Sequence, residues 1–502
     1  MRYRSVPATA VALATVLATG ACSSPTVNAG TRASDGQVTS GHVTSSLDWR
    51  DCHTANTAPQ LECATVTVPL DWSHPDGKKI SLAVDRLRAT DTSHRIGSLL
   101  VNPGGPGGSG TATVGQGGMF LGSADLKPLR ERFDLVGLDP RGVGDSTPVR
   151  CSTPVYDPAA PTFPANEAQY RRLVASSRRH GLDCAKATGP LIGRVDTVSA
   201  ARDVDAVRAA LGESRITWLG VSYGTELGAA YARLFPGRVR AMVLDGAVDH
   251  TRSVARDAID ESTAIEREFR RFAAWCTATG DCALHGRDVV KDFDALVARA
   301  GRGEVDDPAL KRSLSAAEVT SATYAYLTMR SMWPQLGTAL AAAEKTPSDA
   351  SALGQALVGA DPTYPAYRAI GCQDFPPDIH GYADLRARMA AVRKAAPHMW
   401  RYSEFWDWTT GCSGWPVKAA DPPAPQRITG VPTVLVVGNT YDPSTPYAWA
   451  RSLARQISGS RLLTYDGDGH TALYHSSCAR HDEVDYLLTG QAPAPGTRCD
   501  AE

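Results

Sequence analysis

Short apolar runs alternate with amphipathic stretches through most of the chain. Hydrophobic runs bounded by turn residues predict buried strands, and hydrophobic residues spaced by three and four predict helices. Strands are predicted at residues 66–70, 80–84, 99–101, 135–138, 216–219, 239–244, 434–437 and 462–463, and helices at 203–211 and 225–234. This alternation is typical of a mostly parallel sheet covered by helices on both faces.

The pattern changes in the middle of the chain. Residues 251–425 contain long amphipathic helical stretches, such as 258–275, and few strand signals. Proline and glycine then punctuate the sequence before the sheet pattern returns. We therefore expect one sheet built from two parts, residues 46–250 and 426–502, separated by a helical lid.

The N-terminus resembles a secretory signal peptide, predicted over residues 1–21. Basic residues precede an apolar run at 11–18, which is too short to span a bilayer, and small residues follow. Cys22 comes directly after them, as in a lipobox, although Thr19 stands where that motif usually has leucine. Two interpretations stay open: a lipid on Cys22 that anchors the secreted protein to the cell membrane, or simple cleavage. Residues 22–45 are predicted to be a flexible tether.

The cysteine count agrees with an oxidising, extracellular location. The chain has 11 cysteines, and setting Cys22 aside leaves an even number, enough for up to five disulfides. Proximity in sequence suggests the pairs Cys52–Cys63, Cys151–Cys184, Cys276–Cys282, Cys372–Cys412 and Cys478–Cys499. No C-x-x-C pair is present and the histidines lack ligand spacing, so no metal is expected.

Composition adds one constraint on the partner. Hydrophobic residues make up 43% and charged residues 21% of the 502 residues, which is ordinary for a globular protein. The formal net charge of −1 offers no field for steering onto nucleic acid or an anionic membrane. The expected partner is therefore a substrate of small or modest size. The oligomeric state is not predicted.

The strongest chemical signal is Gly-Val-Ser-Tyr-Gly at residues 220–224, a G-x-S-x-G motif. It lies between the predicted strand 216–219 and the predicted helix 225–234. A serine on such a tight turn projects from the edge of the sheet, and small neighbours let strand and helix approach each other. Ser222 is therefore the candidate nucleophile; the alternative is a tight turn without chemistry.

A serine hydroxyl needs a base, which is held in turn by an acid. Asp442 follows the predicted strand 434–437, and His470 follows the one that includes 462–463. Their separation leaves room for one helix and one strand, which brings both loops to the same sheet edge. Asp442 and His470 thus complete a candidate triad in the order serine, acid, histidine.

Other residues compete for these roles. His475 and His481 lie near His470 but occupy predicted loop or helix positions. Asp245, at the end of the strand after the motif helix, could serve as the acid in a variant arrangement. Asp466 and Asp468 are expected to shape the turn that carries His470.

A glycine-rich segment, residues 102–110, follows the predicted strand 99–101. Its N–H groups, together with that of Tyr223, are expected to form an oxyanion hole. Gly105, Gly107 and Gly110 also fit a dinucleotide fingerprint, but two prolines interrupt it and no helix is predicted to open at Gly110. A further turn, residues 139–146, is interpreted as a charge-braced support for the active-site edge.

Taken together, these motifs resemble the tripeptidyl aminopeptidases, secreted bacterial enzymes of the α/β-hydrolase fold related to proline iminopeptidases. The resemblance rests on residues 102–110, 139–146, 220–225, Asp442 and the Gly469-His470 pair, and runs from about residue 47 to residue 499. It implies removal of short peptides, often tripeptides, from free N-termini of peptides or proteins, without metal or organic cofactor. It also implies that Gly105 and Tyr223 donate the oxyanion hydrogen bonds and that Thr445 lies close to the active site.

An enzyme that acts at a free N-terminus must recognise an ammonium group, for which a carboxylate is the natural partner. The candidates are Glu226 beside the motif serine and Asp374 and Glu404 in the insertion. Four tryptophans of the insertion could wall the cleft or pack in a core: Trp400, Trp406, Trp408 and Trp415.

Two alternative functions remain open at this point. A carboxylesterase or lipase would use the same triad on ester bonds. A lipoprotein that binds a solute or partner without chemistry would need no triad at all.

Overall fold

The computed structural model describes residues 47–501 except 118–121, 155–159 and 358–361. Within these residues, ten strands form one sheet in the order β1-β2-β3-β5-β4-β6-β7-β10-β11-β12. Strands β5, β4, β6, β7, β10, β11 and β12 run parallel to one another. Strands β1, β2 and β3 pair antiparallel at one edge, and β3 is also antiparallel to β5. The predicted α/β-hydrolase fold is confirmed. The predicted signal peptide, the tether and Cys22 lie outside the described residues.

The predicted strands correspond to the central members of this sheet. The strands are β1 (Arg50–Asp51), β2 (Glu62–Pro69), β3 (Lys79–Leu87), β4 (Gly97–Asn102), β5 (Phe133–Leu138), β6 (Ile216–Val221), β7 (Val239–Asp245), β10 (Leu435–Tyr441), β11 (Arg461–Asp468) and β12 (Arg498–Asp500). Strands β4, β5 and β6 are buried along their whole length, as expected for strands covered on both faces.

Helices cover both faces of the sheet, and alternate side chains of one strand enter different cores. Leu100 of β4 packs with helices on one face, whereas Leu99 and Val101 pack with those on the other. The first group comprises α4 (Glu167–Thr188), α5 (Thr197–Ala210), α6 (Gly224–Leu234) and α15 (Tyr447–Gln456). The second comprises α1 (Gly110–Gly115), α3 (Lys127–Arg132) and α16 (Ser477–Thr489).

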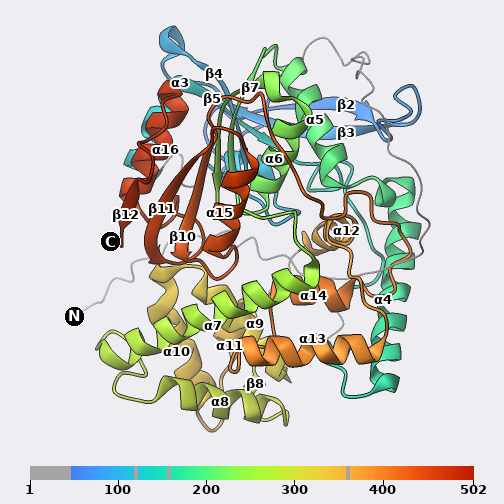
Figure 1. Cartoon of the computed structure of the whole chain (residues 1–502), viewed down its shortest axis with the longest axis vertical. Helices are drawn as coiled ribbons and strands as arrows, with labels where there is room; N and C mark the ends of the chain where they lie inside the picture. Colours follow the sequence, from blue (N-terminus) through green and yellow to red (C-terminus); the bar gives the residue numbers. More distant parts are fainter. Residues whose placement is uncertain (1–46, 118–121, 155–159, 358–361, 502) are drawn as a thin grey trace.

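Between the neighbouring strands β7 and β10 the chain leaves the sheet and forms a helical insertion. Its helices are α7 (Val254–Ala278), α8 (Val289–Ala300), α9 (Ala316–Leu327), α10 (Trp333–Ala343), α11 (Ser351–Gln355), α12 (Tyr364–Asp374), α13 (Tyr382–Ala395) and α14 (Glu404–Gly411), with a small hairpin of β8 (Asp306–Asp307) and β9 (Arg312–Ser313). Figure 1 shows most of these helices gathered below the sheet. Both predicted boundaries, residues 251 and 425, fall outside helices and strands.

The insertion has a hydrophobic core of its own, centred on Phe269, Phe272 and Trp333. Helices α12 and α14 are different, because their buried residues, such as Tyr367 and Trp408, belong to the core that covers one face of the sheet. The insertion therefore packs firmly on the sheet through α12 and α14.

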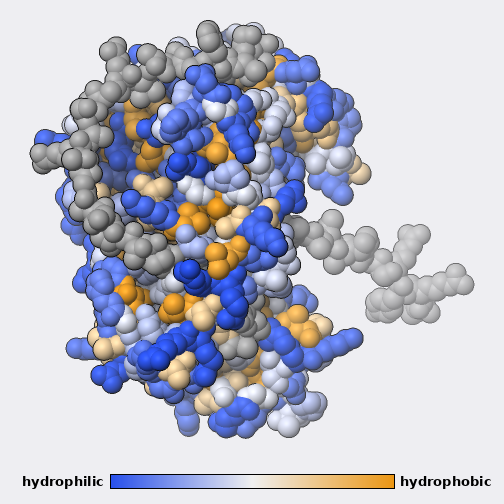
Figure 2. All heavy atoms as spheres, turned by 90° about the vertical axis from the view of Figure 1, so that its right-hand side faces the viewer, coloured by the Kyte–Doolittle hydropathy of each residue, from blue (hydrophilic) through white to orange (hydrophobic). Residues whose placement is uncertain are grey.

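Among the described residues, five disulfides join the pairs suggested by sequence proximity: Cys52–Cys63, Cys151–Cys184, Cys276–Cys282, Cys372–Cys412 and Cys478–Cys499. Within the described part of the chain, none of the helices has the length and apolar character needed to cross a bilayer. On the face drawn in Figure 2 hydrophilic residues predominate, and hydrophobic residues lie in small separate patches.

Candidate active site

Ser222 occupies a strained turn between β6 and α6. Its φ of 57° lies in the left-handed region, which a non-glycine residue adopts only under constraint. Its N–H donates to the carbonyl of Asp245 at 2.8 Å. A Cβ on Gly220 would lie 2.2 Å from the carbonyl oxygen of Gly224, so any larger residue would force strand and helix apart. The motif thus has the geometry of a nucleophile elbow.

Asp442 and His470 form a close pair on the loops that follow β10 and β11. His470 Nδ1 lies 3.0 and 2.9 Å from the two carboxylate oxygens of Asp442. Thr445 donates both its N–H, at 2.8 Å, and its hydroxyl, at 2.9 Å, to the same carboxylate. Because Nδ1–H donates to Asp442, the lone pair of the neutral ring lies on Nε2, where a base needs it.

The charges of this pair support each other. Burial opposes ionisation of Asp442. The charge of His470 and the backbone N–H groups that donate to Asp442 outweigh burial and hold the pKa of this carboxyl below its usual value. Burial alone would lower the pKa of His470, yet the negative charges of Asp442 and Glu404 outweigh it and raise that pKa. The structure therefore favours the imidazolium that forms when a base takes a proton.

His470 and Ser222 meet at the same edge of the sheet. A Cβ on Gly246 would lie 3.1 Å from His470 Cε1, and Gly246 directly follows Asp245, to which the Ser222 N–H is bonded. Among the described residues no hydrogen bond joins the Ser222 hydroxyl to His470. Such catalytic hydrogen bonds commonly tighten only when substrate is bound.

The glycine-rich loop passes directly over the elbow. A Cβ on Gly104, whose φ is 89°, would lie 2.4 Å from the carbonyl oxygen of Val221, so only glycine permits this approach. Gly105 and Tyr223 both line the pocket next to Ser222. Within the described residues, neither of their N–H groups donates to a protein oxygen. Both donors are therefore available to a developing oxyanion.

One expectation about this loop is wrong. A short helix, α1, does open at Gly110, and its N-cap Ser109 accepts from the N–H of Ala112. The helix is possible because Gly110 packs against β5, where a Cβ would lie 2.3 Å from the carbonyl oxygen of Leu138. The presence of α1 does not support the dinucleotide interpretation. The glycine-rich loop before α1 packs against Ser222 and its neighbours, so it is not open to a dinucleotide.

The turn at residues 139–146 braces this loop. Asp139 Oδ1 accepts from the Ser109 hydroxyl at 2.6 Å and from the Thr111 N–H at 3.1 Å. Arg141 is fully buried and forms a two-pronged ion pair with Asp203, with both N–O distances at 2.7 Å. These charges hold the glycine-rich loop and α5 in fixed positions relative to the sheet.

A pocket opens at Ser222. Its lining comes from the core and from the insertion: Gly105, Ser222, Tyr223, Val248, Phe375, Glu404, Phe405, Trp408, Ser444 and Thr445. Most of the wall is apolar, and Glu404 is its one carboxylate. Val248, Phe375, Phe405 and Ser444 were not identified from the sequence, because nothing local marks a residue that becomes a pocket wall through packing.

Glu404 is the first residue of α14 and is partly exposed in the pocket. Its Oε1 accepts from the Tyr324 hydroxyl at 2.8 Å, and that hydroxyl also lies 2.6 Å from Ser444 Oγ. Burial raises the pKa of Glu404 to about 7, although the Tyr324 hydrogen bond and nearby His470 act in the opposite direction. A cation in the pocket would shift this carboxyl to its ionised form.

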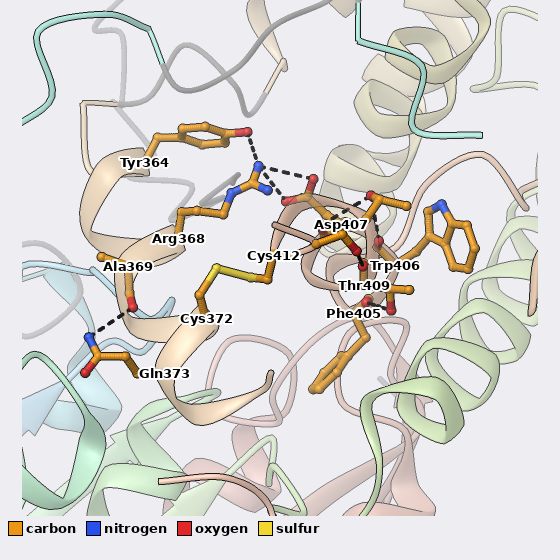
Figure 3. The surroundings of a disulfide bond; sticks show 12 residues. Tyr364, Arg368, Ala369, Cys372, Gln373, Phe405, Trp406, Asp407, Thr409 and Cys412 are labelled. Carbon is orange, nitrogen blue, oxygen red and sulfur yellow. Dashed lines mark hydrogen bonds and ion pairs between the residues drawn. A yellow bond between two sulfur atoms is a disulfide. The ribbon is translucent and has the colours of Figure 1, made fainter. Parts of the chain in front are cut away.

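Helix α14, which carries Glu404, Phe405 and Trp408, is held in place from two sides. Figure 3 shows the Cys372–Cys412 disulfide joining α12 to the end of α14, with Arg368 of α12 reaching Asp407 of α14 at 3.3 Å. At the other end, Glu261 of α7 accepts the N–H groups of Glu404 and Phe405, each at 3.0 Å. The pocket wall is therefore rigidly connected to the rest of the insertion.

Two of the predicted ammonium-binding residues lie outside the pocket. Glu226 is buried behind the elbow, with its Oε1 3.3 Å from His250 Nδ1. Asp374 is also buried; it accepts the Thr197 hydroxyl at 2.6 Å and the Tyr223 hydroxyl at 3.2 Å. Neither carboxylate can meet a substrate in the pocket, because both are buried and neither lines it. Glu404 and Thr445, in contrast, do line the pocket.

Of the four tryptophans named from the sequence, one lines the pocket and the others pack elsewhere. Trp408 lines the pocket and stacks on Phe375 with 4.8 Å between ring centroids. Trp406 stacks on Phe163, and Trp400 meets the same ring edge-on. Trp415 is buried in the core.

The rivals for the triad roles have other partners. Asp245 accepts the N–H groups of Ala472 at 3.0 Å and Leu473 at 2.8 Å, so it holds the histidine loop from the core side. His475 Nε2 lies 3.2 Å from the carbonyl of Thr328. His481 is exposed on α16 and pairs with Asp485.

Comparison with known proteins gives a consistent picture. Residues 398–499 match a family model described as TAP-like protein. The chain is 34% identical to a tripeptidyl aminopeptidase of Streptomyces lividans, covering 90% of this chain and 86% of that enzyme. It is 34% identical to the serine protease Hip1 of Mycobacterium tuberculosis, covering 90% and 91%, and 36% identical to carboxylesterase B of the same species, covering 87% and 86%.

Proposed function

This chain belongs to the tripeptidyl aminopeptidase family of α/β-hydrolases and is a serine peptidase; from this premise we propose that it releases short peptides, tripeptides foremost, from free N-termini. The observation that carries the proposal is the pocket itself. It brings together Ser222, the two expected oxyanion donors and the carboxylate of Glu404. A carboxylate so close to the nucleophile suits a substrate whose charged N-terminus lies a few residues from the scissile bond.

The proposed mechanism follows from the geometry of the pair and the elbow. His470 Nε2 takes the proton of Ser222 while Oγ attacks the scissile carbonyl carbon, and Asp442 holds the imidazolium that results. The N–H groups of Gly105 and Tyr223 stabilise the oxyanion. His470 then protonates the leaving amine, and the acyl-enzyme is hydrolysed by a water molecule that the same histidine activates.

Selection of a free N-terminus is assigned to Glu404. An ammonium group entering the pocket would meet this carboxylate, which shares the cavity with Ser222. Because its pKa is about 7, the positive charge of the substrate would draw off the proton and form a charge-assisted hydrogen bond. Substrates without that charge would form no ion pair with Glu404, whose hydrogen bond to Tyr324 is neutral in character.

The test is a panel of chromogenic amides incubated with the mature enzyme. A tripeptidyl amide should be cleaved faster than the matching dipeptidyl and tetrapeptidyl amides. The N-acetylated tripeptidyl amide should be cleaved poorly. Equal cleavage of the free and the acetylated form would exclude aminopeptidase character, and equal cleavage of all lengths would exclude tripeptide selection.

Esterase activity is the second candidate, favoured by the relative named carboxylesterase B. The same triad attacks esters, so the panel should include short acyl esters. Rapid turnover of esters with none of peptide amides would replace the first proposal. A non-catalytic binding role predicts that a fluorophosphonate probe does not label the wild type at all.

We also propose that the protein is secreted and attached to the membrane through a lipid on Cys22. The five disulfides support an oxidising location. Metabolic labelling with a fatty acid should mark the wild type and not Cys22→Ala. Soluble, unlabelled wild-type protein in the medium would show simple cleavage instead.

A further inference from the structure

The loop that carries His470 is bound from two directions. From the core, Asp245 accepts the N–H groups of Ala472 and Leu473, and Asn439 donates to the carbonyl of Gly469 at 2.9 Å. From the insertion, different groups bind the residues immediately around the histidine. The base of the proposed mechanism thus lies at a junction between the two parts of the molecule.

The contacts from the insertion are direct and involve the histidine's own backbone. Glu268 of α7 accepts the N–H of Gly469 at 3.0 Å. The carbonyl of Thr328, the residue after α9, accepts the N–H of His470 at 2.7 Å. Two successive peptide groups of the loop are therefore fixed by two different helices of the insertion.

We propose that Glu268 is a positioning residue, which fixes the orientation of His470 toward Ser222 through the N–H of Gly469. The inference rests on the proposed function, since it assigns a role within that site. It means that the insertion does more than shape the pocket, because it also sets the geometry of the base. An imidazole displaced by about 1 Å loses about 100-fold in rate.

The surroundings of Glu268 explain why a carboxyl group can serve here. The side chain is fully buried, and its Oε2 has no hydrogen-bond partner among the described residues. Burial and the nearby charge of Asp468 raise the pKa of Glu268 well above its usual value. A neutral carboxyl that accepts one N–H is closely matched by the amide of glutamine.

Helix α7 itself offers a matched control in Glu266. That carboxylate is also buried, and it accepts the N–H groups of His398 at 3.0 Å and Met399 at 3.1 Å. It thus performs the same kind of backbone binding on the same helix. Its partners lie within the insertion, away from the histidine loop.

The experiment compares Glu268→Leu, Glu268→Gln and Glu266→Leu by the rate at which a fluorophosphonate probe labels Ser222. The probe carries no ammonium group, so recognition of an N-terminus by Glu404 does not enter its labelling rate. We expect Glu268→Leu to lower the labelling rate by about 10- to 100-fold. Glu268→Gln should stay within about threefold of the wild type, because the acceptor is retained. In peptide hydrolysis the Glu268→Leu loss should fall on kcat with little change in KM.

Glu266→Leu should lower the melting temperature about as much as Glu268→Leu while keeping the wild-type labelling rate. Equal losses of rate in the two leucine variants, or none in Glu268→Leu, would overturn the inference. If Glu268→Leu does not fold, Glu268→Asp takes its place, since it withdraws the carboxyl by one methylene, with Glu266→Asp as its control. Failure of the proposed function is distinct, because it would appear in the wild type's own panel of peptide amides, whereas the labelling rates compare variants through the reactivity of Ser222 alone.

Discussion

The core and the insertion both contribute to the pocket, but in different ways. The core supplies Ser222, Asp442 and His470, each on a loop at the end of a strand that the local sequence marks. The insertion supplies Glu404, Phe405 and Trp408 on one helix, which Glu261 and a disulfide connect to neighbouring helices of the insertion. In this protein local sequence marks the residues of the triad, whereas the pocket wall and the final orientation of His470 depend on long-range packing.

The largest expected effect tests the core. Ser222→Ala removes the nucleophile and should lower kcat by about 10⁶-fold, as measured with the tripeptidyl amide. The elbow itself should persist, because Gly220 and Gly224 remain and alanine is smaller than serine. A variant that kept substantial activity, or that was still labelled by the fluorophosphonate, would place the nucleophile elsewhere.

The local character of the core explains why the sequence predicts it well. The predicted strand 216–219 and helix 225–234 correspond to β6, Ile216–Val221, and α6, Gly224–Leu234. A mostly apolar strand followed by a glycine-flanked turn leaves few alternatives. Helix α4 was missed, because the residues it buries include Ser176, Ser177 and Gly181, which give no apolar stripe.

The insertion was predicted as helical, but its role at the site was not resolved. Glu226, Asp374 and Glu404 were equal candidates, and the sequence alone cannot separate them. Only packing buries the first two behind the elbow and exposes the third in the pocket. Glu268 was missed altogether, since its partner lies some 200 positions away in the chain.

The second largest effect tests the contribution of the insertion. Glu404→Gln should reduce kcat/KM for the free tripeptidyl amide by roughly 10- to 100-fold, because it removes the charge that pairs with the ammonium group. The change should appear mainly in KM. The N-acetylated substrate serves as the control and should be unaffected. A loss of equal size for both substrates would show that Glu404 acts on catalysis rather than on recognition.

A smaller effect is expected on the pH dependence of activity, where Glu404 of the insertion influences His470 of the core. His470 must be neutral to accept a proton, so activity should fall as the pH drops through its pKa, which the charges of Asp442, Glu404 and Asp245 raise above 6.5. Glu404→Gln removes one of these charges and should move the acidic limb of the labelling rate to lower pH. An unmoved limb would show that Glu404 does not influence the base.

The smallest effect is expected at Glu226, the carboxylate on the core helix α6. Burial and the nearby charge of Asp421 raise its pKa well above the usual value, so a neutral amide should replace it with little change in charge. Glu226→Gln should therefore leave KM for the free and the acetylated amide within about twofold, in contrast to Glu404→Gln. The two variants compare Glu226, which is near Ser222 in sequence, with Glu404, which lies in the same pocket as Ser222. A selective rise in KM for the free substrate in Glu226→Gln would move ammonium recognition from the insertion to the core.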